Sequence, residues 1–436
     1  MNKPIDAEDH IAKRASEDPD FRERLLSKPK ATIEQEFGVT LAEDHEIHVH
    51  EETDALTHLV LPPRSKQSDE ERDAARTGVA SLEFLKKTMY DPAPPIRPAG
   101  ANPADARLSS LAVGELAKAG RESIRRGLDF LESTLDENGA WHCIRFNIAD
   151  PNVPRHFERP AFISALCVLA LESCDEERAR ALCARTRSHL VDTMEYPGLW
   201  RYYRHLPLDL DSTALCSLVL ASHRSHPWML LGRNVAPMLA NRDNEGLFMT
   251  WVLAEGEPDV VSSFRIDADP VVNANVIAYL GNRPETRAAL TWLEAMIAED
   301  KLEGSSKWYP DRVTAYYAIS RAMILTQPAL DHLRPILLDR ILSLRDGKGE
   351  FGNVLLTAQA ISALYNIGSL DSIDAKRAVE SFIGAQREDG SWPELLAFGD
   401  QALKWGIVGQ FGHGSEAVTS AFCIEALERL LEVVST

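Results

Sequence analysis

Six glycine–aromatic turns recur beyond residue 105 of this 436-residue chain, and they constrain its fold more than any other feature. The turns are Gly139-Ala140-Trp141, Gly198-Leu199-Trp200, Gly246-Leu247-Phe248, Gly304 to Trp308, Gly349-Glu350-Phe351 and Gly390-Ser391-Trp392. Successive turns lie roughly 40 to 60 residues apart, a period typical of helical-pair arrays and closed toroids.

Each turn is followed by a segment that is small and apolar nearly all round. These segments are 159–171, 211–222, 270–281, 311–325, 354–368 and 415–431. A helix without a polar face belongs inside a protein, whereas a helix with one apolar stripe, such as 374–388, faces water on its other side. Six inner and six outer helices predict a mostly α chain that closes as an (α/α)6 toroid over residues 106–436.

The first part of the chain has a different pattern. Residues 17–38 have helical spacing and end at a glycine, and 46–52 and 56–62 alternate like two strands. We therefore expect a small α+β unit over residues 1–66. Residues 67–105 are expected to form one helix, over 71–90, and a Pro-rich linker before the toroid.

Composition excludes several classes of function. A net charge of -19 without a basic stripe makes nucleic acid an unfavourable partner. No stretch is long and apolar enough for a membrane span, and the N-terminus lacks a secretory signal, so we expect a cytoplasmic protein. No Walker loop or dinucleotide-binding loop is present, and we expect no cofactor.

The segment Gln386 to Trp392 reads QREDGSW, and it resembles the Q-x-x-D-G-S-W element of squalene-hopene cyclases and related class II terpene cyclases. Gln and Trp can tie the end of an outer helix to the next turn, and Gly permits a left-handed backbone there. The resemblance implies an (α/α)6 toroid of the prenyltransferase and terpene-cyclase type.

The segment Asp209 to Ala214, at the start of the second inner helix, looks like the D-x-D-D-T-A acid motif of the same family. The resemblance implies that Asp211 is the general acid, with Asp209 at the first position and Ser212 in place of the fourth aspartate. A carbon–carbon double bond is a very poor base, so its protonation needs a neutral carboxylic acid in a dry cavity. The alternative is ordinary helix capping by Asp and Ser.

Other polar and aromatic residues are expected at the mouth where the inner helices begin. Asp269 and Asn273 lie at the start of the third inner helix, where they could contact substrate or cap the helix. We expect no metal site. The aromatic residues near the mouth are Trp200, Tyr202, Tyr203, Tyr309, Tyr316 and Tyr317. Aromatic faces stabilise carbocations, so Trp200, Tyr203, Tyr316 and Tyr317 are candidate substrate-binding residues. The chain has no Asp-Asp pair for class I diphosphate chemistry and no zinc-ligand set.

Residues 11–63 contain the elements DPDFRERLL, KATIEQEFGV and LTHLVLPP, and they resemble the nitrile-hydratase-like leader peptides of ribosomally made natural products. No Gly-Gly cleavage site follows. The resemblance implies an association module for a pathway partner or for another copy of the chain.

Two functions remain open. The first is a terpene-cyclase-like enzyme of natural product biosynthesis that cyclises an isoprenoid or polyene. The second is a non-catalytic or peptide-modifying toroid of a modified-peptide pathway, recruited through its leader-like unit.

Overall fold

The computed structural model describes residues 14–16, 18–37, 49, 91–92, 112–148, 152–203, 206–222, 232–253, 268–326, 328–399 and 411–434. The chain divides into two compact units, Met1–Arg72 and Asp73–Thr436. The strands expected at 46–52 and 56–62, except residue 49, and the helix expected at 71–90 lie outside the described residues. The domain boundary expected at residue 66 remains a prediction.

The described part of the first unit contains two short helices, α2 (Pro19–Ser27) and α3 (Pro29–Phe37). The sequence predicted one helix here. The helix ends at Lys28 because a residue before proline is disfavoured in the α conformation. Asp18 caps α2 by accepting a hydrogen bond from Phe21 N at 2.9 Å.

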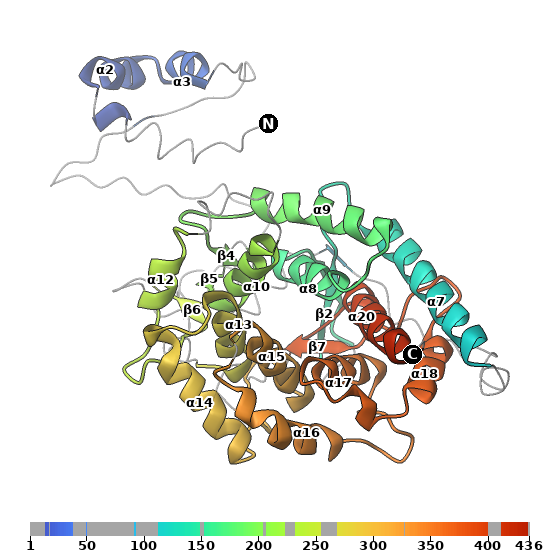
Figure 1. The fold of residues 1–436 in the computed structure, drawn as a ribbon. Helices are drawn as coiled ribbons and strands as arrows, with labels where there is room; N and C mark the ends of the chain where they lie inside the picture. Colours follow the sequence, from blue (N-terminus) through green and yellow to red (C-terminus); the bar gives the residue numbers. More distant parts are fainter. Residues whose placement is uncertain are drawn as a thin grey trace. The chain divides into compact units, whose positions relative to one another are not determined.

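The second unit is a ring of helix pairs, as predicted (Figure 1). The six inner helices in its described residues are α8 (Ala161–Leu171), α10 (Leu210–Ala221), α13 (Pro270–Leu280), α15 (Arg312–Leu325), α17 (Val354–Asn366) and α20 (Glu416–Val434). Each inner helix contacts the next one, and α20 contacts α8, which closes the ring.

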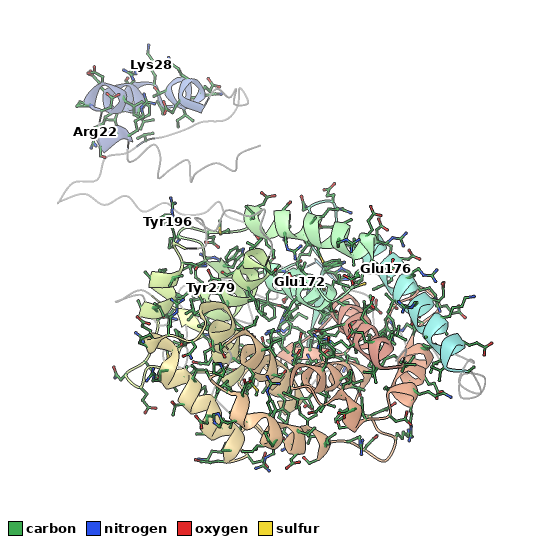
Figure 2. All side chains as sticks on the ribbon, in the orientation of Figure 1. Arg22, Lys28, Glu172, Glu176, Tyr196 and Tyr279 are labelled. Carbon is green, nitrogen blue, oxygen red and sulfur yellow. The ribbon has the colours of Figure 1, made fainter. Side chains whose placement is uncertain are left out.

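The outer layer of the described ring follows the chain in the same order. Its helices are α7 (Val113–Thr134), α9 (Glu177–Asp192), α12 (Val235–Ala240), α14 (Arg287–Ala298), α16 (Arg334–Leu342) and α18 (Ala375–Ala385). Short 3-10 helices, η2 (Pro284–Thr286), η3 (Asp331–Leu333) and η4 (Leu370–Ser372), precede the last three of them. Side chains fill the space between the two layers (Figure 2), and one continuous hydrophobic core runs through the ring.

The turns between the layers share one construction. The six predicted glycines all have positive φ angles, between 59° and 111°. In five of the six turns, the aromatic residue's backbone N–H donates to a polar side chain near the start of the inner helix, as Trp392 N does to Ser420 Oγ at 3.0 Å. Where that aromatic residue is tryptophan, its indole N–H donates to a carbonyl of the outer helix. The predicted Gln386 bonds also form, to Gly390 O and to Ser123.

Two small antiparallel sheets lie among the described loops, and the sequence analysis did not predict them. One has the order β1 (Asp91–Pro92), β3 (His156–Glu158), β2 (Cys143–Asn147), β8 (Phe411–Gly414) and β7 (Leu396–Gly399). The other has the order β4 (Trp200–Arg201), β5 (Leu208–Asp209) and β6 (Trp251–Val252). The strands are too short to show an alternating pattern in the sequence. No helix among the described residues is long and apolar enough to cross a membrane.

Candidate active site

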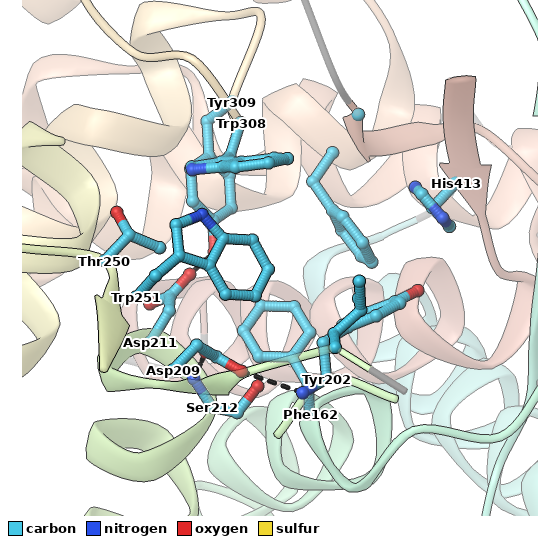
Figure 3. Close-up of a pocket in the computed structure, with 13 residues that line it drawn as sticks. Phe162, Tyr202, Asp209, Asp211, Ser212, Thr250, Trp251, Trp308, Tyr309 and His413 are labelled. Atoms are coloured by element: carbon cyan, nitrogen blue, oxygen red, sulfur yellow. Dashed lines mark hydrogen bonds between the residues drawn. The ribbon is translucent and has the colours of Figure 1, made fainter. Parts of the chain in front are cut away.

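Asp209 connects the three-stranded sheet to the start of α10. In β5 it pairs with Trp200 on one side and with Trp251 on the other. Its carboxylate caps α10 by accepting a hydrogen bond from Ser212 N at 2.6 Å, and its second oxygen accepts one from Tyr202 N at 2.8 Å (Figure 3). Asp209 is therefore occupied in fixing the backbone around the next carboxyl group.

Asp211 lies in the first turn of α10 and is buried, with 7% of its surface exposed. Its Oδ1 accepts a hydrogen bond from Asn275 Nδ2 at 2.6 Å, and its Oδ2 accepts one from the Tyr309 hydroxyl. The Asn275 oxygen in turn accepts a hydrogen bond from Arg321 on α15. Because a guanidinium group only donates, Arg321 fixes the Asn275 amide with its NH2 group toward Asp211.

Burial weakens both acids. It raises the pKa of Asp209 to about 7, even though the Ser212 and Tyr202 backbone amides favour the charged form. It raises the pKa of Asp211 to about 6, and the hydrogen bonds from Tyr309 and Asn275 limit that rise. Both carboxyl groups therefore take up protons far more readily than an exposed aspartate, as an acid catalyst near neutral pH requires.

A pocket opens beside these carboxyl groups. Its described lining is mostly aromatic. Asp209, Asp211 and Ser212 lie on one wall (Figure 3), and the aromatic side chains are those of Phe162, Tyr202, Trp251, Trp308, Tyr309 and Phe398. Trp251 and Trp308 meet edge to face, with ring centroids 5.6 Å apart. The site therefore places a weak acid against an apolar space walled by π faces.

A second, smaller space lies among the inner helices and shares Tyr309 and Phe398 with the first cavity. Asn275, Tyr317 and Arg321 also line it. The Arg321 guanidinium is buried and lies 5.1 Å from the Tyr317 ring centroid. The network behind Asp211 therefore faces this second space.

His413 lines the first cavity as well, and in Figure 3 it is drawn on the side away from Asp211. Its ring stacks on Phe398, with centroids 4.9 Å apart and 10° between the planes. Its Nε2 lies 3.2 Å from Oε2 of the buried Glu158. The site therefore has a second ionisable pair on another wall.

Several predicted substrate contacts do not line the described cavity. Trp200 is a turn residue whose indole donates to Leu190 O, and Asn273 binds both backbone groups of Phe248. Tyr316 is buried on α15 without lining the cavity, and Tyr203 does not line it either.

Asp269 and Tyr317 also lie away from the main cavity. Asp269 caps α13 and accepts hydrogen bonds from Ser306 Oγ at 2.6 Å and from Lys307 N at 2.9 Å, so it fastens the fourth turn. Tyr317 lines only the smaller space.

Sequence reasoning missed Trp251, Trp308, Phe162, Phe398 and Arg321. Trp251, Trp308 and Phe398 lie on turns or short strands without helical periodicity, so no spacing rule identifies them. Trp308 had a usable signal, because its turn is longer than the Gly-x-aromatic turns. Among the described residues, no group of three or more His, Cys, Asp or Glu side chains is placed to hold a metal ion.

Comparison with solved structures identifies the class of fold: the ring is the fold of type II terpene cyclases. A variant of the cyclase MstE from Scytonema, in complex with its substrate geranylgeranyl dihydroxybenzoate, matches with a TM-score of 0.58 and 15% identity, over 74% of this chain and 99% of that chain. A second, ligand-free variant matches with a TM-score of 0.57 and 17% identity, over the same shares of the two chains. A protein from Actinoplanes matches with a TM-score of 0.54 and 17% identity, over 73% of this chain and 100% of that chain.

The first part of the chain has its own relative. Residues 13–83 match the family described as "Nitrile hydratase, alpha chain", which confirms the resemblance noted in the sequence. A search of curated protein sequences finds no match.

Proposed function

We propose that this protein is a class II terpene-cyclase-like enzyme that starts cyclisation of an isoprenoid or polyene by protonating a double bond, with Asp211 as the general acid. The observation that supports this most is the position of a buried carboxyl group with a pKa of about 6 against an aromatic-lined cavity. A hydrocarbon chain fits such a lining because the cavity offers few polar partners.

The hydrogen bonds of Asp211 determine which oxygen transfers the proton. Oδ1 faces the Asn275 NH2 group, which can only donate, so Oδ1 acts as an acceptor in both protonation states. The acidic proton is therefore carried on Oδ2, beside the Tyr309 hydroxyl. A hydroxyl group can accept from the acid and donate to the carboxylate, and the bond to the charged carboxylate is the stronger one, so Tyr309 favours the charged form of Asp211.

The cavity then serves the carbocation. Protonation of a terminal double bond breaks the Oδ2–H bond, forms a C–H bond and leaves a cationic carbon. The π faces of Trp251, Trp308 and Phe162 offer negative quadrupoles to that charge. Asp211 remains as the carboxylate, stabilised by Tyr309 and Asn275.

Ser212 stands where the resembling family has a further aspartate. In this chain its backbone N–H binds Asp209 at 2.6 Å, and its hydroxyl also favours charged Asp209. Because the Ser212 side chain is neutral, it adds no third negative charge beside Asp209 and Asp211, whose pKa values are already raised. Tyr309, Asn275 and Arg321 supply the environment of the acid instead.

The test is Asp211→Asn, assayed with geranylgeraniol, farnesol, squalene and geranylgeranyl dihydroxybenzoate. The amide keeps the size of the side chain but cannot deliver a proton, so turnover is expected to fall by at least about a hundredfold. Circular dichroism should show an unchanged fold. Equal consumption of these compounds by the variant and the wild type would remove Asp211 as the acid.

A second candidate function rests on residues 13–83, whose match to the nitrile hydratase alpha family agrees with a leader-like unit. In this alternative the toroid is non-catalytic, or modifies a peptide in its cavity, and is recruited to a modified-peptide pathway through residues 11–63. The same unit is the proposed site for a pathway partner or for self-association. Pull-down with the isolated segment 1–66, compared with a chain that lacks it, tests that recruitment.

A further inference from the structure

A cyclisation that starts with a proton must also dispose of one, and Asp211 supplies only the first half of this balance. When a carbocation becomes an alkene, a C–H bond beside the cationic carbon breaks and its electron pair forms the new double bond. The released proton needs an acceptor at the cavity wall. This requirement rests on the proposed function.

We propose that His413, supported by Glu158, is the base that takes up this proton. His413 is buried, with 4% of its surface exposed, yet it lines the cavity that contains Asp211. Figure 3 draws the imidazole and Asp211 on different sides of that cavity. The proposed acid and base are therefore separate groups.

The five-stranded sheet positions the pair. His413 in β8 lies across from Arg145 in β2, and Glu158 in β3 lies across from Cys143 in β2. Three neighbouring strands thus bring His413 Nε2 to 3.2 Å from Glu158 Oε2. These residues are far apart in the sequence, and only the pairing of the strands brings them together.

Two neighbouring side chains stabilise the Glu158 carboxylate. Arg145 Nε lies 3.3 Å from Glu158 Oε1, and the Tyr202 hydroxyl donates to Oε2 at 2.5 Å. Arg145 balances the charge of the carboxylate before the reaction. When the imidazole takes up the proton, Glu158 faces the new imidazolium charge at hydrogen-bond distance.

The surroundings also direct the carbocation toward this wall. Phe398 stacks on His413, and Tyr202 meets the imidazole edge to face with centroids 5.5 Å apart. Both aromatic rings line the cavity. They can stabilise a cation that has migrated away from Asp211 until the imidazole removes the proton.

After the step, the imidazolium passes its proton to solvent, and the Asp211 carboxylate is protonated again from solvent. The net change in the substrate is an isomerisation, with no oxidant or reductant. Glu158 acts through His413 and is a positioning residue. His413 is the group that contacts the substrate.

The test compares His413→Phe with His332→Phe, using the four isoprenoid probes named above and mass spectrometry of the products. Phenylalanine keeps the stack on Phe398 but cannot accept a proton. We expect His413→Phe to consume substrate while at least about half of its product changes to other alkene isomers or water-captured alcohols. His332 is an exposed histidine paired with Glu294 on the outer layer, and its variant should give wild-type products.

Glu158→Gln provides a second reading if His413→Phe does not fold. It leaves the imidazole in place but removes the charge that stabilises imidazolium, so the product pattern should shift in the same direction by a smaller amount. Wild-type products in the same ratio from either folded variant would overturn the assignment of the base. Failure of the proposed function looks different: wild-type protein would consume none of the probes, or Asp211→Asn would consume them equally, and the role of His413 would fall with it.

Discussion

Replacing Tyr309 by phenylalanine tests the acid through a single hydrogen bond. The hydroxyl donates to Asp211 Oδ2, and burial holds the pKa of Tyr309 well above its usual value, so the phenol stays a neutral donor over the working pH range. Tyr309→Phe keeps the ring in the cavity wall and removes only the donor. The carboxylate then keeps one side-chain partner, Asn275.

The size of the effect follows from the protonation state that the bond favours. A hydrogen bond to a charged group contributes about 1.5 to 3 kcal/mol, and one pKa unit corresponds to about 1.4 kcal/mol. Removing the bond should therefore raise the pKa of Asp211 by about one to two units from its present value of about 6. A general acid works only while protonated, so turnover falls as the pH rises through this pKa.

Two measurements check this shift. The falling limb of the pH–turnover profile should move to higher pH in Tyr309→Phe, with a lower plateau because the acid is weaker. A carbon-13 NMR titration of the aspartate carboxyl groups should show the same shift without any substrate. Tyr316→Phe is the matched control, since Tyr316 is buried on α15 but does not line the described cavity. An unmoved limb and an unmoved carboxyl resonance in Tyr309→Phe would refute the role of the Tyr309 hydrogen bond in setting the pKa of Asp211.

Three further outcomes are expected. Gly390→Ala should destabilise the protein by about 2 kcal/mol more than Gly349→Ala in denaturant melts, because both glycines have φ near 85° but a Cβ at Gly390 meets Arg126 O at 2.2 Å; equal midpoints would contradict this contact. Because the folded-state pKa of Asp209 is raised to about 7, its stabilising effect is complete below the unfolded pKa and is lost as the pH rises through 7. Asp209→Asn should therefore remove about 2 kcal/mol of the stability that the wild type gains between pH 8 and 5.5, and parallel pH profiles would argue against it. A chain that starts at Ser68 should keep its helical circular dichroism and cooperative melting, and loss of folding would show that the first unit completes the ring.

The sequence was sufficient for the ring because its determinants are local and repeated. Each repeat shows a positive-φ glycine before an apolar inner helix, and both features are encoded within a few residues. The Lys28-Pro29 pair indicates a helix break, because a residue before proline disfavours the α conformation. The sequence still predicted one helix, because the helical spacing continues on both sides of the pair. The two small sheets could not be predicted, because their strands are short and pair with segments far along the chain, as Phe411–Gly414 does with Cys143–Asn147.

The candidate acid was visible in the sequence, whereas its environment was not. Asp209 and Asp211 were identified from a motif within one helix start, which the chain encodes locally. The partners of Asp211 come from α13 and the fourth turn, and Arg321 on α15 binds Asn275, so only the packing of α10, α13 and α15 against one another brings these groups together. We predicted Trp200 and Tyr316 as substrate contacts because they are aromatic and lie near the starts of inner helices. In the structure Trp200 packs in its turn and Tyr316 is buried on α15, and neither lines the described cavity.

The fourth turn shows why a break in the repeat marks the site. In the first, second and last turns, the tryptophan enters the core and its indole binds the outer helix. Between Gly304 and Trp308 the turn is longer, and Asp269 holds it through Ser306 and Lys307 instead. Trp308 and Tyr309 therefore do not form the common turn, and both line the cavity. One repeat thus gives up the common turn and supplies both an aromatic wall and the hydrogen-bond partner of Asp211.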